Sequence, residues 1–326
     1  MIKLSIIICT RNRADKLDAM LEALRGVKSK HSWEVLLVDN ASTDNTQAIL
    51  KKAVLTLPQA RVLLAETVGL GAARDFSWRQ AKGEIIMFTD DDCYVASNIV
   101  DSVIDVFEEH PNIDFAGGRI MLHNPTDFPV TIDERNVAED INPHIFAPPG
   151  VMQGANMSFR RTALERVDGF DRSFGAGTPF PCEDIDVVAA CIWEGMSGRF
   201  DPRMSVRHDH GRKEKDYPDL MASYDRGRGA YYTKYILRGD SRSAYLKGWT
   251  RMTFSYLGRK NLGTFRREMR SALTYLKLRR ATVFRIMAVL LAAIIYAALF
   301  IAVIGNKVLV VVSRLGKHTQ GERISE

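Results

Sequence analysis

The sequence has few cysteines and lacks the spacing that zinc and redox sites use. Its four cysteines, Cys9, Cys93, Cys182 and Cys191, include no Cys-x-x-Cys pair, and no secretion signal precedes them. We therefore expect no disulfide framework or structural zinc, and a reducing compartment. A P-loop is also absent, and residues 69–74 (GLGAAR) lack the third glycine of a dinucleotide fingerprint, which disfavours a Rossmann dehydrogenase.

Positive charge is scarce in the first two thirds of the chain. Residues 1–210 hold 22 Lys+Arg against 31 Asp+Glu, whereas residues 211–285 hold 19 against 6, within a net charge of +6. A basic protein can bind nucleic acid, but here the basic residues directly precede the most apolar stretch of the chain. We therefore expect no nucleic-acid partner, and a membrane with anionic lipid instead.

The apolar stretch predicts a membrane helix. Residues 286–305 are 20 consecutive residues without a charge, enough to span a hydrocarbon layer of ~30 Å. We predict a transmembrane helix over 286–312 and a polar tail over 313–326; the alternative is a buried or interfacial hairpin helix. In residues 215–285, basic residues alternate with aromatic ones, which predicts helices that rest on acidic headgroups. The aromatic residues are Tyr231, Tyr232, Tyr235, Tyr245, Trp249, Phe254, Tyr256, Phe265 and Tyr275.

The first 210 residues alternate strand-like and helix-like runs. This order predicts an α/β fold with a mainly parallel sheet, in which ligands bind beyond the carboxyl ends of the strands. Polar residues gather at those ends, in 10–13, 39–44 and 90–92. The expected strands are 3–9, 34–39, 61–65 and 84–89, and the expected helices are 15–24, a helix capped by 42–44 that ends near 57, and 71–81.

Three consecutive carboxylates, Asp90, Asp91 and Asp92, follow the last of these strands. Like charges this close repel and raise one another's pKa, and a cation relieves the repulsion. Oxygen ligands at a strand end, with positions left open for phosphate oxygens, suit Mg²⁺ or Mn²⁺. A solvated acidic turn is the alternative, but the position at the ligand-binding edge of the sheet favours the metal.

Five segments follow one another in an order typical of one family: SIIICTRNRADKLDAMLEAL, VDNASTDNT, VGLGAARDFSWRQAKGEIIMFTDDDC, GANMSFRR and PCEDIDVVAACIWEG. Together they resemble the family 2 glycosyltransferases, which have the GT-A fold, over about residues 3–210. The resemblance implies a GT-A catalytic domain over 1–214, followed by the basic helical region 215–285 and the membrane helix.

The resemblance also implies a site for a nucleotide-diphosphate sugar and a divalent metal. Asp90 and Asp92 match the outer carboxylates of the family's D-x-D motif, in which the last carboxylate binds the metal. His208, rather than His210, matches a histidine that binds the metal in many relatives. The other matched positions of the sugar-donor site are Thr10, Arg11, Arg13, Asp39, Asp44, Arg74, Asp91 and Asn156.

The pair Glu183 and Asp184 matches the family's E-D motif. The resemblance implies that Asp184 is the general base and that Glu183 helps to position the acceptor. Inverting transfer requires a base on the face opposite the departing diphosphate, whose developing charge must be neutralised. Without the resemblance, Asp184 reads as a carboxylate at a helix N-terminus.

These features imply a metal-dependent, inverting glycosyltransferase of the hexosyltransferase type. The Q-x-x-R-W motif of processive membrane synthases is absent, which favours transfer of single sugars. We expect a lipid-linked or polysaccharide acceptor in cell-envelope polysaccharide biosynthesis. Nucleotide sugars and reduced thiols belong to the cytosol, so we expect a single-pass inner-membrane protein with a cytoplasmic catalytic domain. Two alternatives stay open: a polyprenyl-phosphate sugar synthase, and a non-catalytic membrane-bound nucleotide-sugar-binding protein.

Overall fold

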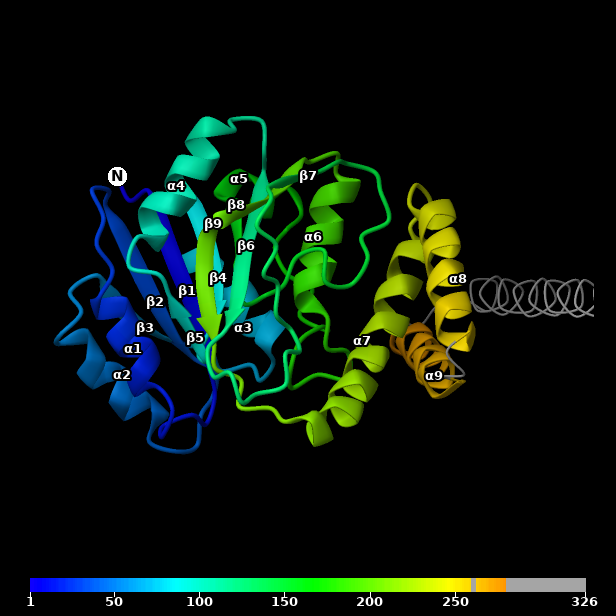
Figure 1. The fold of residues 1–326 in the computed structure, drawn as a ribbon, viewed down its shortest axis with the longest axis horizontal. Coiled ribbons are helices and arrows are strands. Elements are labelled where there is room, and N and C mark those ends of the chain that lie inside the picture. Colours follow the sequence, from blue (N-terminus) through cyan, green and yellow to red (C-terminus); the bar gives the residue numbers. More distant parts are fainter. Residues whose placement is uncertain (259–261, 280–326) are drawn as a thin grey trace, which may run out of the picture. The chain divides into compact units, whose positions relative to one another are not determined.

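The computed structural model describes residues 1–258 and 262–279 (Figure 1). Met1–Ala272 form one compact unit, and the described residues of the second unit, 273–279, are the C-terminal part of the helix Leu262–Leu278 and the residue after it. The predicted transmembrane helix over 286–312 and the tail over 313–326 lie outside the described residues. Within the two described ranges, no helix is long and apolar enough to cross a membrane.

A mixed sheet forms the centre of the first unit. Its strands are β1 Leu4–Thr10, β2 Trp33–Asp39, β3 Ala60–Leu64, β4 Ile85–Asp90, β5 Cys93–Val95, β6 Phe115–Leu122, β7 Glu139–Ile141, β8 Met157–Arg160 and β9 Gly198–His208. The half ordered β3-β2-β1-β4 is parallel throughout, which confirms the prediction for these strands, whereas β8, β6, β9 and β5 continue the sheet with mixed directions. Thr10 of β1 pairs with Asp39, and Cys9 pairs with Asp90, so the polar ends of three strands meet at one edge.

Helices cover both faces of the sheet. They are α1 Asp18–Arg25, α2 Thr46–Val54, α3 Leu70–Gln80, α4 Ile99–Glu109, α5 Arg161–Arg166, α6 Glu183–Trp193, α7 Tyr217–Leu237, α8 Arg242–Gly258 and α9 Leu262–Leu278, with a 3₁₀ turn η1 Glu214–Asp216 before α7. On one face, alternate residues of β1 (Leu4, Ile6, Ile8) share a core with α1, α2 and α4, as the period of two in a strand requires. The other face packs against α3, α5 and α6, and α6 lies between the sheet and α7 in Figure 1.

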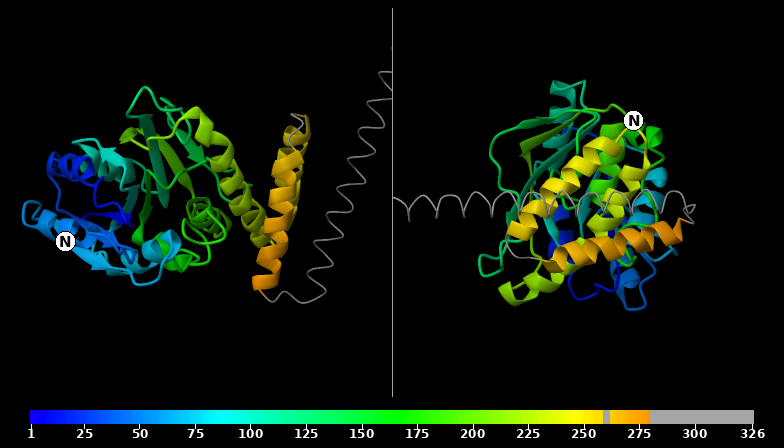
Figure 2. Two further views of the ribbon diagram at one scale, coloured as in Figure 1. Left: turned by 90° about the horizontal axis from the view of Figure 1, so that it is seen from below. Right: turned by 90° about the vertical axis from the view of Figure 1, so that its right-hand side faces the viewer.

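Five aromatic side chains of α7 and α8 lie inside the protein, which corrects for these five the prediction that they rest on a membrane surface. Tyr231, Tyr232, Tyr235 and Tyr245 are at most 2% exposed, and Trp249 is 9% exposed. The hydroxyl oxygens of Tyr231 and Tyr245 lie 2.6 Å apart, and the rings of Tyr235 and Tyr245 stack with centroids 4.8 Å apart. These rings join α7 to α8, which run side by side in both views of Figure 2, and they are not available to lipid headgroups.

Candidate active site

A cavity of about 1130 Å³ opens at the edge where the parallel strands end. The ends of β1 and β4 line one part of it, the beginnings of α3 and α6 and the first half of α7 line others, and residues of the loops 130–135, 149–155 and 176–178 complete the wall. Open α/β sheets bind their ligands at this edge. Of the predicted site residues, those that line the cavity are Thr10, Arg11, Arg13, Arg74, Asp90, Asp91, Asp92, Glu183, Asp184 and His208.

The acidic run after β4 is tied to the end of β1. Thr10 Oγ1 donates to Asp91 Oδ2 at 2.5 Å, and Arg13 Nη2 lies 3.0 Å from Asp92 Oδ2. Burial raises the pKa of Asp91 to about 6, against the hydrogen bond from Thr10 and the charge of Arg13. Burial also acts to raise the pKa of Asp92, but His208, whose Nε2 lies 3.2 Å from Asp92 Oδ1, holds that pKa below its usual range. Asp92 is therefore charged over a wider pH range than Asp91.

Four side chains at this edge form a group that fits a metal ion. The ligand atoms of Asp90, Asp92, Cys93 and His208 all lie within 4.8 Å of one another. Burial raises the pKa of Cys93 well above its usual range, so this sulfur stays a thiol and is a poor ligand. Two carboxylates and one imidazole remain, a set that suits Mg²⁺ or Mn²⁺ with positions left for phosphate oxygens. The group contains the three predicted metal ligands.

Arg74 of α3 connects the two acidic motifs. Its side chain is 2% exposed, with Nη2 2.7 Å from Asp90 Oδ1 and Nη1 2.9 Å from Glu183 Oε1. Nη2 also donates to the carbonyl oxygen of Gly154 at 3.1 Å. Burial raises the pKa of Glu183 to about 7, and the charge of Arg74 opposes that rise. The resemblance assigned Arg74 to the nucleotide sugar; the structure places its guanidinium between the protein's own carboxylates, where it holds the motifs together.

Asp184 lies in the first turn of α6 and is half-buried. Its Oδ2 accepts a hydrogen bond from the backbone N–H of Gly154 at 3.0 Å, and its Oδ1 accepts one from the backbone N–H of Ile185 at 2.7 Å. The two bonds fix the direction of the carboxylate and leave each oxygen a further lone pair for a substrate hydroxyl. Cys182, the residue before α6, has φ 154° and ψ 28°, a costly conformation for a residue other than glycine.

Three predicted residues do not line the cavity. Asp39 accepts a hydrogen bond from the backbone N–H of Ser42, and Asp44 accepts two, from N–H groups after β1 and at the start of α2. Asn156 is 1% exposed and donates to backbone carbonyls of β6 and β9. These side chains hold loops and strands in place, and their contacts with a sugar donor stay predictions.

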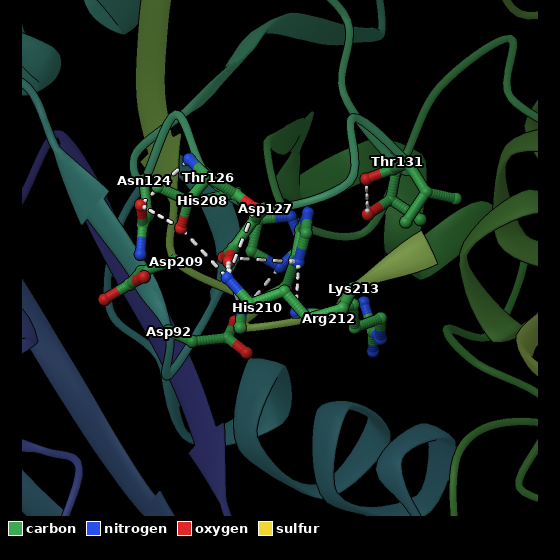
Figure 3. Close-up of polar contacts among 12 residues, drawn as sticks. Asp92, Asn124, Thr126, Asp127, Thr131, His208, Asp209, His210, Arg212 and Lys213 are labelled. Carbon is green, nitrogen blue, oxygen red and sulfur yellow. Dashed lines mark hydrogen bonds and ion pairs between the residues drawn. The ribbon is translucent and has the colours of Figure 1, made fainter. Parts of the chain in front are cut away.

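Sequence reasoning missed the side of the cavity that follows β9. Arg212, Tyr224 and Arg228 line it, and the last two belong to α7. Burial raises the pKa of Tyr224 to about 12, so its hydroxyl stays a hydrogen-bond donor at neutral pH. The recognisable motifs stop near residue 210, and the basic and aromatic residues beyond it had been assigned to the membrane. Arg212 lies four residues after His208, and Figure 3 shows it on the same segment as His208 and His210.

Comparison with known proteins agrees with this geometry. The family described as "Glycosyl transferase family 2" matches residues 5–168. An uncharacterised glycosyltransferase of Bacillus subtilis is 29% identical over 115 residues, 35% of this chain and 29% of that protein. A cholesterol galactosyltransferase of Borreliella burgdorferi is 31% identical over 99 residues, 30% of this chain and 27% of that protein. The chain thus spans under a third of the length of either relative.

Among solved structures, a mannosyltransferase from Pyrobaculum calidifontis in complex with GDP-Man and Mn²⁺ has a similar fold. The TM-score is 0.57 at 20% sequence identity, and the match covers 91% of this chain and 80% of the other. The mixed α/β architecture is therefore that of the GT-A glycosyltransferases.

Proposed function

This chain belongs to glycosyl transferase family 2, and from that premise we propose that it moves a sugar from a nucleotide-diphosphate sugar to a hydroxyl group of an acceptor, with inversion and with a divalent metal. The observation that carries the proposal is the position of Arg74. One buried guanidinium contacts Asp90 of the predicted metal group and Glu183 of the E-D motif. The sites for the leaving group and for the base therefore lie on either side of one side chain, in one cavity.

The residues divide the reaction between them. Asp90, Asp92 and His208 would hold Mg²⁺ or Mn²⁺, which would offset the charge that develops on the departing diphosphate. Asp184 accepts the proton of the attacking hydroxyl, because its direction is fixed by two backbone N–H groups while lone pairs remain free. Arg74 keeps Glu183 at the start of α6, so that the base stays beside the sugar donor.

The structural neighbour with GDP-Man and Mn²⁺ supports a nucleotide sugar and a metal, but it does not identify the nucleotide of this chain. We propose a lipid-linked or polysaccharide acceptor at the cytoplasmic face of the inner membrane. This part rests on the sequence of residues 286–305, which carries no charge, and on the basic residues before it.

The substitution Asp184→Asn tests the function. The wild-type chain, given Mn²⁺ and a panel of UDP-, GDP- and dTDP-sugars, should be stabilised against heat by one class of donor, and a chelator should reduce the effect. D184N should keep that stabilisation and lose more than about 99% of transfer to hydroxyl acceptors, within the 10²–10⁴-fold contribution of a general base. Asp219→Asn, the same change in the first turn of α7, is the control.

Each alternative gives a different result in that experiment. A mild loss of transfer in D184N favours a polyprenyl-phosphate sugar synthase, because a phosphate acceptor needs no strong base. Binding of the sugar donor without transfer to any component of a membrane extract favours a non-catalytic nucleotide-sugar-binding protein. If no nucleotide sugar stabilises the wild-type chain, the proposed function is wrong.

A further inference from the structure

The segment of residues 209–216, which joins β9 to α7, brings Arg212 into the cavity (Figure 3). It packs against the loop that follows β6. The backbone N–H of His123 donates to the carbonyl oxygen of His208 at 3.1 Å, and the backbone N–H of Phe128 donates to the carbonyl oxygen of Arg212 at 2.9 Å. The segment thus follows directly after a predicted metal ligand, His208, and is held by residues more than eighty positions earlier in the chain.

An ion pair between the buried Asp127 and the exposed Lys213 fastens this segment. The side chain of Asp127 is 1% exposed; its Oδ1 accepts from Lys213 Nζ at 2.7 Å and its Oδ2 accepts from the backbone N–H of Gly211 at 3.0 Å. Lys213 Nζ also donates to Thr126 Oγ1 at 2.9 Å. The hydrogen bond from Lys213 holds the pKa of Asp127 below its usual range, so the pair is charged at neutral pH. We call Thr126, Asp127 and Lys213 the clamp.

The clamp holds the neighbours of Arg212 on both sides, because Asp127 contacts Gly211 and Lys213. The N–H of Arg212 donates to Nδ1 of the fully buried His210 at 3.0 Å, and its carbonyl oxygen accepts from Phe128. Both backbone groups are therefore fixed, one by a side chain and one by the loop. The guanidinium is left to line the cavity, where it is half-buried.

Arg212 differs from the other half-buried or buried arginines of the cavity wall. Those four each pair with carboxylates of the protein: Arg13, Arg74, Arg135 and Arg228. For the side chain of Arg212, residues 1–258 and 262–279 provide neither an ion pair nor a hydrogen bond. A half-buried charge without a counter-ion costs free energy, which a bound anion would recover. The geometry is therefore that of a side chain placed for a ligand.

The position of Arg212 indicates which anion it would meet. Burial acts to raise the pKa of Asp92, and neighbouring basic groups, Arg212 among them, act to lower it, so Arg212 lies within electrostatic range of the predicted metal group. A divalent cation at that group would leave the surroundings of Arg212 positive. Phosphate oxygens are the ligands that both a guanidinium and such a cation prefer.

We propose that Arg212 binds a phosphate group of the substrate beside the predicted metal position, and that the clamp positions it for that contact. The inference rests on the proposed function and names a residue of that same site. The phosphate could belong to the diphosphate of the sugar donor or to a phosphorylated acceptor. The binding and turnover arms of the test separate these two sources.

The first test removes the guanidinium. In the full chain with Mn²⁺, calorimetry measures the Kd of the nucleoside diphosphate that stabilises the wild type, and of the matching monophosphate. Arg212→Gln should raise the Kd of the diphosphate about tenfold or more and the Kd of the monophosphate less, as expected for one lost charge-assisted contact. An unchanged diphosphate Kd with a raised KM for the acceptor would assign the contact to the acceptor. If neither changes, Arg212 binds no phosphate and the inference is wrong.

Lys215→Gln is the matched control for that substitution. Lys215 is exposed, belongs to the same segment and does not line the cavity, so K215Q should keep the wild-type Kd. If K215Q weakens the nucleotide as much as R212Q does, the effect is one of general charge and the specific contact is refuted.

The second test asks whether the clamp acts through Arg212. Lys213→Met breaks the pair from its exposed side, and Asp127→Asn breaks it from the buried side. Each substitution should raise the Kd of the diphosphate several-fold in the wild-type background and should not change it further in the R212Q background. Additive losses in the double variants would refute the positioning role. Should D127N fail to fold, K213M decides, because the Lys213 side chain is 47% exposed.

Failure of this inference is distinguishable from failure of the proposed function. If the wild-type chain binds no nucleotide, the function is wrong and the inference falls with it. If the wild-type chain and R212Q bind nucleotide and turn over acceptor equally, the function stands and Arg212 alone has been misassigned.

Discussion

At the scale of single residues, Arg74 faces two carboxylates with one positive charge. Asp90 Oδ1 lies 2.7 Å and Glu183 Oε1 lies 2.9 Å from its guanidinium; Arg74 and Glu183 are buried, whereas the Asp90 side chain is 32% exposed. One cation does not neutralise two anions at a partly buried site, so a proton is retained in the group. Burial raises the pKa of Glu183 to about 7 and also raises the pKa of Asp90, and Arg74 opposes both rises, so Glu183 takes a share of this proton near neutral pH.

We predict that Glu183→Gln changes how stability depends on pH. A folded-state pKa of about 7, above the ordinary 4.5, contributes stability that is full below pH 4.5 and is lost as the pH rises through 7. Glutamine does not ionise, so the free energy of unfolding of E183Q should rise relative to that of the wild type between these pH values, by about 3 kcal/mol at most. Urea unfolding in the presence of a chelator, from about pH 5 to about pH 8, measures the difference.

Glu165→Gln is the control for that series, because Glu165 is an exposed glutamate at the end of α5. The difference in the free energy of unfolding between E165Q and the wild type should not depend on pH over the same range. A flat difference for E183Q as well would mean that Glu183 is ionised throughout, and that Arg74 compensates both carboxylates.

The residues that sequence reasoning located correctly are those whose position follows from a strand end. Asp90 and Asp92 come directly after a buried strand, so the topology of an open sheet is enough to place them at its binding edge. Asp39 also ends a strand, but its carboxylate turns back to a local N–H group. Arg212 was missed because its position depends on contacts with residues 123–128, which no local pattern reports.

At the scale of elements, α7 packs directly on the loop that leads into the E-D motif. A Cβ at Gly227 would lie 1.4 Å from the carbonyl oxygen of Pro181 and 2.4 Å from Cys182 Sγ. Tyr235 of the same helix donates to the backbone oxygen of Asp186 at 2.8 Å. The helix thus acts as a support for the first turns of α6, and glycine at 227 permits the close approach that this requires.

We predict that Gly227→Ala uncouples this support. The added methyl group has no space, so α7 or the loop before Glu183 must shift, at a cost of about 1–3 kcal/mol in the free energy of unfolding. The rate of sugar transfer should fall even where the protein stays folded, because the shift moves the proposed base, Asp184. Thermal unfolding and transfer rates measure the two effects.

Gly239→Ala provides the comparison for that variant, since a Cβ at this position would meet nothing within 4 Å. It should change neither stability nor transfer appreciably. If G227A transfers sugar at the wild-type rate, α7 is a structural cover and not a support for the E-D motif.

The same helices show where sequence patterns lose their meaning. The strands β1 to β4 were predicted within one or two residues, because continuous apolar runs between turn residues have few other interpretations. In α7 and α8, basic and aromatic residues alternate in a way that suits either a membrane surface or a folded interior. The structure decides for the interior at Tyr231 and Tyr245, whose partners lie on different helices.

At the scale of the whole molecule, an acidic catalytic region is followed by a strongly basic one. Residues 1–210 have nine more acidic than basic side chains, and residues 211–285 have thirteen more basic ones. Part of the basic excess is used internally, as in the pairs of Arg228 with Glu268 and Arg267 with Asp225. The basic residues that stay exposed, together with the uncharged run at 286–305, are the observations behind the proposal that the protein attaches to a membrane.

We predict that residues 280–326 hold the protein in the membrane and are not needed for its fold. A chain ending at residue 279 keeps the whole first unit, so it should bind the sugar donor as the full chain does. Two arginines in the apolar run, Leu290→Arg and Leu299→Arg, cost about 2.5–3.5 kcal/mol each on insertion and leave the basic region intact. When membranes are extracted with alkaline carbonate, the full chain should stay bound, whereas the shortened chain and the double variant should be released.

Release of the full chain under the same conditions would show that the run does not span the bilayer. Salt-sensitive binding of the shortened chain to anionic vesicles would then assign attachment to the basic helices alone.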